Sequence, residues 1–307
     1  MALVMNCDMG EGYGLYTCGD DEGIMPYITL ANVACGFHAS DPAVMRKTVR
    51  LAKQYGVKVG AHPSFPDLQG FGRREMKMTR DELSACIIYQ VGALKAFLDA
   101  EGMPLNHIKP HGALYGLAAR DEQTAHAVCD AAEVFGAPLL GMAGTCHETV
   151  YTGRGIPFLA EYYTDLDYDD DGSLIITREH QAKDTAEAVR RALRVAREGK
   201  ATSINGKDLP MRADCICVHS DTPGALQLAK AVCEALAPFL QPGAALRPRN
   251  GASASHTAFA RATAPGVSEC TQIQSARIGI SLPLIEVALP SLAARTARLT
   301  ASVVSLA

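Results

Sequence analysis

The chain has 307 residues, 48% of them apolar and 20% charged, which is the balance of a globular protein with an ample core. A formal net charge of −4 gives no electrostatic basis for binding nucleic acid or an anionic membrane surface. We find no apolar run near the ~20 residues that cross a bilayer, and no basic start typical of a signal peptide.

The ten cysteines are scattered through the chain and form no Cys-x-x-Cys pair. This pattern favours buried free thiols in a reducing compartment. We therefore expect a soluble, cytoplasmic protein that has no nucleic-acid or membrane partner.

In chain order, short apolar strands alternate with helices. The first three predicted strands are Leu3–Cys7, Leu30–Cys35 and Val57–Ala61. A helix is expected from Pro42 to Gly56, because Asp41 suits the N-cap and glycine suits the C-terminal end. A second helix should begin at Thr79, where Thr79 and Glu82 have the spacing of a capping box, and end near Gly102.

The second half of the chain repeats this order. Its predicted strands are His107–Pro110, Pro138–Met142, Phe158–Tyr162 and Cys215–Val218. Its predicted helices are Asp121–Gly136, Asp184–Gly199 and Asp221 to about Pro238. Between them, Asp167 to Gly172 starts like a calcium loop but lacks the acid at position twelve, so an acidic hairpin turn is predicted.

Seven strands alternating with helices predict an α/β fold with a parallel sheet. Polar residues follow nearly every strand, which favours a closed, TIM-like β/α barrel over an open doubly wound sheet with one switch point. We assign residues 1–240 to this barrel domain. Residues 241–307 contain no lysine and show little periodicity, so we expect an appended tail that is largely disordered.

Polar, chemically capable residues recur where the predicted strands end. The clusters are Asn6/Asp8/Glu11, Cys35/His38, His62/Asp67, Lys109/His111, Glu161/Asp165 and His219/Asp221. The carboxyl ends of barrel strands meet on one face, where barrel enzymes build their sites. The sequence therefore predicts an enzyme.

The first cluster combines an amide with two acids. Asn6 and Asp8 share one face of their strand, and Asp8 is a candidate general base or metal ligand. The alternative for Asp8 is a helix cap. Glu11 lies in a glycine-rich turn, where a solvated loop acid is the alternative to a catalytic role.

His38 and His62 occupy matching positions after adjacent strands, which favours a site over two structural histidines. Lys109 and His111 share a strand face. A lysine inside a barrel needs an anion beside it, so Lys109 is expected to hold a phosphate or a developing oxyanion.

Other polar residues are candidates for substrate binding. Arg73 and Asp67 lie on the turn from Pro63 to Arg74, which could cover the pore as a lid; Arg73 suits a carboxylate, or is simply exposed. Asp165 ends the sixth strand. His219 shares its face with Cys215 and Cys217, so it could also be pore filling, and Asp221 could be an N-cap or a site acid.

Several of these segments together resemble one family. The segments are Asn6–Gly12, Ala31–Asp41, Gly60–Asp67, Phe71–Arg73, Lys109–Tyr115 and Val218–Asp221. In this order, over residues 3–240, they are similar to the LamB/YcsF family, which is associated with the A subunit of 5-oxoprolinase. The resemblance implies an irregular seven-stranded β/α barrel, distantly related to polysaccharide deacetylases.

The resemblance also implies an activity. Such a protein would open the lactam 5-oxoproline to L-glutamate, with ATP as co-substrate, together with the B and C subunits. This chain has no P-loop, so ATP follows from the resemblance alone and would be handled by the partners. Where the family pattern has Ala-Asp-Arg after the sixth strand, this chain has Thr164-Asp165-Leu166. The missing arginine bears on which lactam binds more than on the reaction type.

Two rivals to this function remain. A stand-alone metal-dependent amidase or deacetylase would use Asp8, His38 and His62 as ligands of a divalent ion. A non-catalytic binding protein would keep the barrel without the chemistry, although six polar strand ends argue against it.

Overall fold

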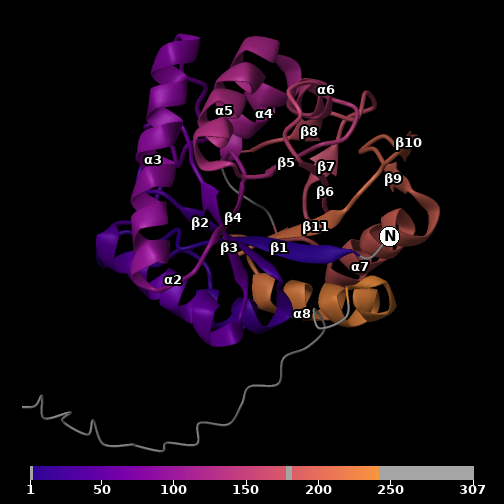
Figure 1. The fold of residues 1–307 in the computed structure, drawn as a ribbon. Coiled ribbons are helices and arrows are strands. Elements are labelled where there is room, and N and C mark those ends of the chain that lie inside the picture. Colours follow the sequence, from indigo (N-terminus) through magenta and orange to yellow (C-terminus); the bar gives the residue numbers. More distant parts are fainter. Residues whose placement is uncertain (1–2, 178–181, 242–307) are drawn as a thin grey trace, which may run out of the picture. The chain divides into compact units, whose positions relative to one another are not determined.

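The protein is described by a computed structural model in which residues 3–177 and 182–241 are placed. Within these residues the central sheet is a closed barrel of seven parallel strands (Figure 1). Their order around the barrel is β1 (Val4–Met9), β11 (Cys215–His219), β6 (Phe158–Tyr163), β5 (Leu139–Gly141), β4 (Leu105–Ile108), β3 (Lys58–His62) and β2 (Leu30–Ala34). The predicted barrel is confirmed, and each strand begins within two residues of its expected position.

The predicted helices are also present. They are α2 (Pro42–Tyr55), α3 (Arg80–Ala100), α5 (Glu122–Phe135), α7 (Thr185–Glu198) and α8 (Ala225–Leu236). Asp41 caps α2 with its side chain, and Thr79 and Glu82 form the expected capping box of α3. Asp221 is not a helix cap, because the N-cap of α8 is Gly224.

The structure contains several further elements, most of them not expected from the sequence. The helices among them are α1 (Asp21–Ile24), α4 (Gly112–Arg120) and α6 (Cys146–Gly153), with 3-10 turns η1 (Met25–Tyr27) and η2 (Ala237–Phe239). Two hairpins also form, β7 (Asp167–Tyr168) with β8 (Leu174–Ile175), and β9 (Lys200–Thr202) with β10 (Asp208–Pro210). The first of these is the expected acidic hairpin. The sequence has no capping residue at the start of α4. Its N-cap is His111, whose side chain makes no capping hydrogen bond.

The barrel interior is layered along the strands. Apolar side chains fill the amino-terminal end, where Val4, Leu30, Leu140 and Cys215 form a small cluster. Polar side chains occupy the next positions of the same faces, including Asn6 on β1 and Asn32 on β2, because alternate residues of a strand point inward. The opposite faces pack against the helices and form the main core. The pore thus changes from apolar to polar toward its carboxyl end.

Helix α3 bears on the expectation that no segment of the chain is long and apolar enough to cross a membrane. By length and composition alone it could cross a membrane, although 39% of its most apolar stretch is buried in the protein. It packs against α2, α5 and the barrel strands β3 and β4. A core helix of a soluble protein passes the same test, so α3 is weak evidence for a membrane span.

The expected tail, residues 241–307, lies outside the described residues except for Gln241. The boundary of the barrel domain at residue 240 therefore stays a prediction.

Gly60 provides a test of how tightly the pore is packed. A Cβ at this position would overlap the ring of His107, which is buried and bonded to Asn32 Oδ1 over 2.7 Å. We expect Gly60→Ala to lower the free energy of unfolding by ~1–3 kcal/mol, measured by urea denaturation. Gly92→Ala is the control, because nothing lies within 4 Å of its Cβ in the middle of α3. That variant should gain ~0.5–1 kcal/mol, and equal stability of the two variants would contradict the packing.

Candidate active site

A buried lysine lies at the centre of the barrel. Lys109 follows β4, and its Nζ is 3.0 Å from Asp8 Oδ1 and 3.0 Å from Glu161 Oε1. It also contacts Asn6 Oδ1 at 3.3 Å and Cys217 Sγ at 3.2 Å. Burial alone would lower the pKa of Lys109, but the surrounding anions raise it well above the usual value. Lys109 is therefore a permanent cation that joins side chains from three strands.

Asp8 links this lysine to the histidines. Its Oδ1 accepts hydrogen bonds from Asn32 and Lys109, and its Oδ2 lies 3.2 Å from His62 Nε2 and 3.6 Å from His219 Nε2. Burial would raise the pKa of Asp8, but His62 and Lys109 outweigh it and hold the pKa well below the usual value. Asp8 is therefore a carboxylate at neutral pH.

His62 and His111 meet edge to face. His62 Nε2 and His111 Nδ1 are 2.9 Å apart, while the other nitrogen of each ring lies 2.8 Å from a backbone carbonyl, that of Lys109 or of Phe71. Phe71 has a φ of 54°, an uncommon conformation for this residue that presents its carbonyl to His111. Burial lowers the pKa of His111 well below the usual value.

Glu11 and His38 form a second buried pair beside these rings. His38 Nε2 is 3.1 Å from Glu11 Oε1, and the His38 ring stacks on His111 with centroids 3.8 Å apart. Burial raises the pKa of Glu11, with Asp221 and Asp8 adding to the rise, and burial lowers the pKa of His38. Glu11 is thus a buried acid and not an exposed loop residue.

His219 and Asp165 act as a pair on the other side of Asp8. Asp165 accepts a hydrogen bond from the backbone N–H of His219 over 2.8 Å, and its Oδ1 lies 3.0 Å from the ring Nδ1. Burial would lower the pKa of His219, but Asp165 outweighs it and raises the pKa. Asp165 therefore fixes the orientation of His219 and does not line the cavity itself.

The loop between β3 and α3 covers part of the site. Arg73 lies at the cavity and pairs with Asp221 at 2.7 Å, so these two residues are partners across the mouth. Asp67 instead binds Arg74 and the backbone N–H of Gly70, which holds the loop in shape. Gly72 allows the loop to pack closely, because a Cβ there would overlap Ser64 and crowd His38 and His111.

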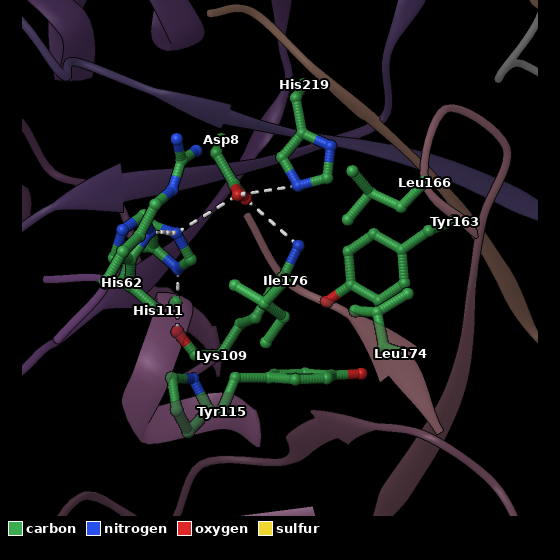
Figure 2. Close-up of a pocket in the computed structure, with 13 residues that line it drawn as sticks. Asp8, His62, Lys109, His111, Tyr115, Tyr163, Leu166, Leu174, Ile176 and His219 are labelled. Carbon is green, nitrogen blue, oxygen red and sulfur yellow. Dashed lines mark hydrogen bonds and ion pairs between the residues drawn. The ribbon is translucent and has the colours of Figure 1, made fainter. Parts of the chain in front are cut away.

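A small cavity opens at this end of the barrel, and its two sides differ in chemistry (Figure 2). It measures about 350 Å³, including the part open to solvent. One side is polar and is formed by Asp8, His62, Arg73, Lys109, His111 and His219. The facing side is apolar and is formed mainly by Tyr115, Tyr163, Leu166, Leu174 and Ile176. The aliphatic part of this wall comes from the end of β6 and from the β7–β8 hairpin.

The site also contains groups of side chains that could hold a metal ion. Ligand atoms of Glu11, His38, His62 and His111 all lie within 4.8 Å of one another, and those of Asp8, Cys217 and His219 form a second such group. All are buried. The ligand set expected from the sequence, Asp8 with His38 and His62, is thus divided between the two groups.

The structure brings most of the candidate residues together. Asp67 instead pairs with Arg74, while Asn6 contacts Lys109 and Asp165 contacts His219. Sequence reasoning did not single out the roles of Asn32, Glu161, Tyr115, Tyr163, Leu174 and Ile176. Glu161 lies at a predicted strand end, but nothing in the sequence pairs it with Lys109. Asn32 lay within a segment that carried the family resemblance.

Fold and site together define a β/α-barrel protein with a buried ionic cluster and a small two-sided cavity at the carboxyl ends of its strands. The chain belongs to the LamB/YcsF family, which it matches over residues 3–248.

Named relatives and a solved structure agree with this membership. The chain is 47% identical over 231 residues to the lactam utilization protein lamB of Emericella nidulans, covering 74% of this chain and 91% of that protein. It is 46% identical over 236 residues to the 5-oxoprolinase A subunit of Chloroflexus aggregans, covering 76% and 94%. The crystal structure of a lactam utilization protein from Thermus thermophilus matches with a TM-score of 0.72 at 45% identity, covering 78% of this chain and 97% of that one.

Replacing Lys109 tests the ionic cluster. Lys109→Met leaves Asp8 and Glu161 as buried anions without their cation, so we expect a loss of ~3–5 kcal/mol in the free energy of unfolding. The double variant Lys109→Met/Glu161→Gln should recover part of this loss, because one of the two charges is removed. Lys95→Met, at an exposed pair with Asp99, should change stability by less than ~1 kcal/mol. Urea denaturation measures all three, and a Lys109→Met protein as stable as the parent contradicts the assignment.

Proposed function

We propose that this chain opens a lactam ring by hydrolysis, as the A subunit of an ATP-dependent 5-oxoprolinase that converts 5-oxoproline to L-glutamate. The two-sided cavity carries the proposal. A lactam has one polar edge, its amide, and an apolar edge of methylene groups, and the cavity offers a matching pair of surfaces. The names of the relatives support the substrate class and an assembly of several subunits.

An amide in a five-membered ring resists hydrolysis, because resonance stabilises the carbonyl and the ring nitrogen is a poor leaving group. We infer that ATP, handled by the partner B and C subunits, phosphorylates the lactam oxygen and so activates the carbon. Within this chain, Lys109 supplies a fixed positive charge at the cavity that stabilises the negative charge formed on attack. His111 lies beside it at the same polar side.

Water activation is the second requirement. Asp8 is ionised, but the cations that keep it so also make it a weak proton acceptor on its own. His62 Nε2 lies 3.2 Å from Asp8, so the two side chains can act together, with the imidazole taking the proton and the carboxylate stabilising the resulting charge. His62 serves as the base where its Nε2 binds no other group, and Asp8 serves as the base where that nitrogen is occupied.

The cytoplasm is the proposed location. All nine cysteines in the described residues are free thiols, as a reducing compartment requires.

Asp8→Asn tests this reaction. The chain, its candidate partner subunits, ATP and 5-oxoproline are combined, and glutamate release is measured. We expect kcat to fall by ~10²–10⁴-fold in the variant, which is the usual contribution of a general base. Asp99→Asn is the control, because this acid is exposed on α3 and far from the cavity in the fold. Unchanged turnover by the Asp8→Asn protein would rule out the assigned role.

The same assay separates the rival function. A stand-alone metal-dependent amidase or deacetylase is favoured by the buried group of ligand atoms around His62. It would release product without ATP and without partner subunits. The proposed enzyme needs both, so turnover by the isolated chain in the absence of ATP would favour the rival.

Leu166 tests which lactam is preferred. This residue lines the apolar wall where the family resemblance predicts an arginine, and Arg73 is already paired with Asp221. We expect Leu166→Arg to lower KM for 5-oxoproline about tenfold, because the new guanidinium can bind the ring carboxylate. KM for 2-pyrrolidinone, which lacks that carboxylate, should not fall. Leu15→Arg adds the same charge at a side chain that is 98% exposed, and an equal effect there would show that net charge alone is responsible.

A further inference from the structure

The two facing nitrogens of His62 and His111 need a positive charge between them. A carbonyl oxygen only accepts hydrogen bonds, so His62 Nδ1 and His111 Nε2 each carry a hydrogen that they donate to a backbone carbonyl, over 2.8 Å. In a neutral ring the other nitrogen then has a lone pair and no hydrogen. These two nitrogens, His62 Nε2 and His111 Nδ1, face each other at 2.9 Å. Two lone pairs at this distance repel unless a proton or a metal ion is shared.

Carboxylate oxygens converge on the same point. Glu11 Oε1 lies 3.5 Å from His111 Nδ1, and Asp8 Oδ2 lies 3.2 Å from His62 Nε2. Asp8 is ionised and only accepts hydrogen bonds, whereas burial raises the pKa of Glu11, so its carboxyl group can supply a single hydrogen. One shared proton can satisfy one pair of these atoms, whereas a metal ion binds several at once.

The spacing fits a small divalent ion. Bonds of about 2.0–2.1 Å to zinc place neighbouring ligand atoms of a tetrahedral site about 3.3 Å apart. The separations here, 2.9 Å between the histidine nitrogens and 3.5 Å from histidine to Glu11, bracket that value. All of the donor side chains are buried.

The remaining contacts are those of a supported metal site. The histidine nitrogens that would not bind the ion are fixed by backbone carbonyls, which is the usual arrangement around ligating histidines. His38 Nε2 lies 3.1 Å from Glu11 and can donate to it, so His38 positions the carboxylate.

We infer that Glu11, His62 and His111 bind one divalent transition-metal ion, zinc or manganese being the candidates. This ligand set of two imidazoles and one carboxylate differs from the set of Asp8, His38 and His62 expected from the sequence. In this arrangement Asp8 lines the cavity and does not bind the ion, and His38 contacts Glu11 and holds its carboxyl group in place. The inference holds for this chain whether or not the lactam reaction needs ATP.

Direct metal binding tests the inference without any substrate. The full chain is purified without a polyhistidine tag, stripped with a chelator, and incubated with Zn²⁺, Mn²⁺ or Co²⁺. Elemental analysis after dialysis should find about one ion per chain, and Co²⁺ should give the visible absorption of a site with nitrogen ligands. A parent chain that retains less than about a tenth of an ion for each of the three metals overturns the inference.

Three single variants locate the site. His62→Gln, His111→Gln and Glu11→Gln should each weaken binding at least tenfold in a calorimetric titration, and circular dichroism shows which of them fold. His126→Gln is the matched control, because this histidine lies on α5, away from the barrel interior, and should bind the ion as the parent does. Full binding by the folded ligand variants would also overturn the assignment.

The outcomes distinguish this inference from the proposed function. A chain that opens lactams but binds no ion overturns the metal site alone. A chain that binds one ion at these residues but opens no lactam, even with partners and ATP, overturns the lactam reaction alone.

Discussion

The ion pairs of Lys109 with Asp8 and Glu161 are the constraint on which the rest of the site depends. They connect β1, β6 and the end of β4 inside the barrel. The apolar cluster at the amino-terminal end of the pore is followed at this level by polar side chains. Burying three charges is costly, and only mutual pairing offsets that cost. The same pairing keeps Asp8 ionised and aims its second oxygen at His62 and His219. The position of the Asp8 carboxylate therefore follows from a structural requirement of the pore.

The cavity is completed by segments outside the barrel. The β3–α3 loop brings Arg73 to the mouth and Phe71 to His111, while the β7–β8 hairpin supplies Leu174 and Ile176. These segments supply aliphatic side chains to the cavity, because the side chains at the strand ends are mainly polar. A small substrate would meet charged groups from the barrel on one side and aliphatic groups from the connections on the other. This division suits a molecule with one polar and one apolar edge.

Much of this could be predicted from the sequence, because local signals determine it. The approximate positions of the strands, Asp41 as a cap and the capping box at Thr79 depend on neighbouring residues, and all were confirmed. The convergence of polar strand ends followed from the topology of a parallel barrel. The partners across the pore could not be predicted. Glu161 is 52 positions from Lys109 in sequence, and its role depends on β6 lying near β4 in the barrel, with only β5 between them. The pairing of Asp67 with Arg74 could not be predicted either, since it depends on how the loop folds.

Asp8 lies between two regions of the pore that differ in how fully their polar groups are paired. On the Lys109 side, each charged group already has a partner of opposite charge, which fixes the position of the lysine and of its positive charge. On the side of His62, His111 and Glu11, acceptor atoms outnumber the hydrogens available to them. Proton transfer or metal binding requires lone pairs that are not yet engaged, and only the second region offers them. The chemistry of this protein should therefore take place between Asp8 and the two histidines, next to the apolar wall, with Lys109 as a fixed charge behind it.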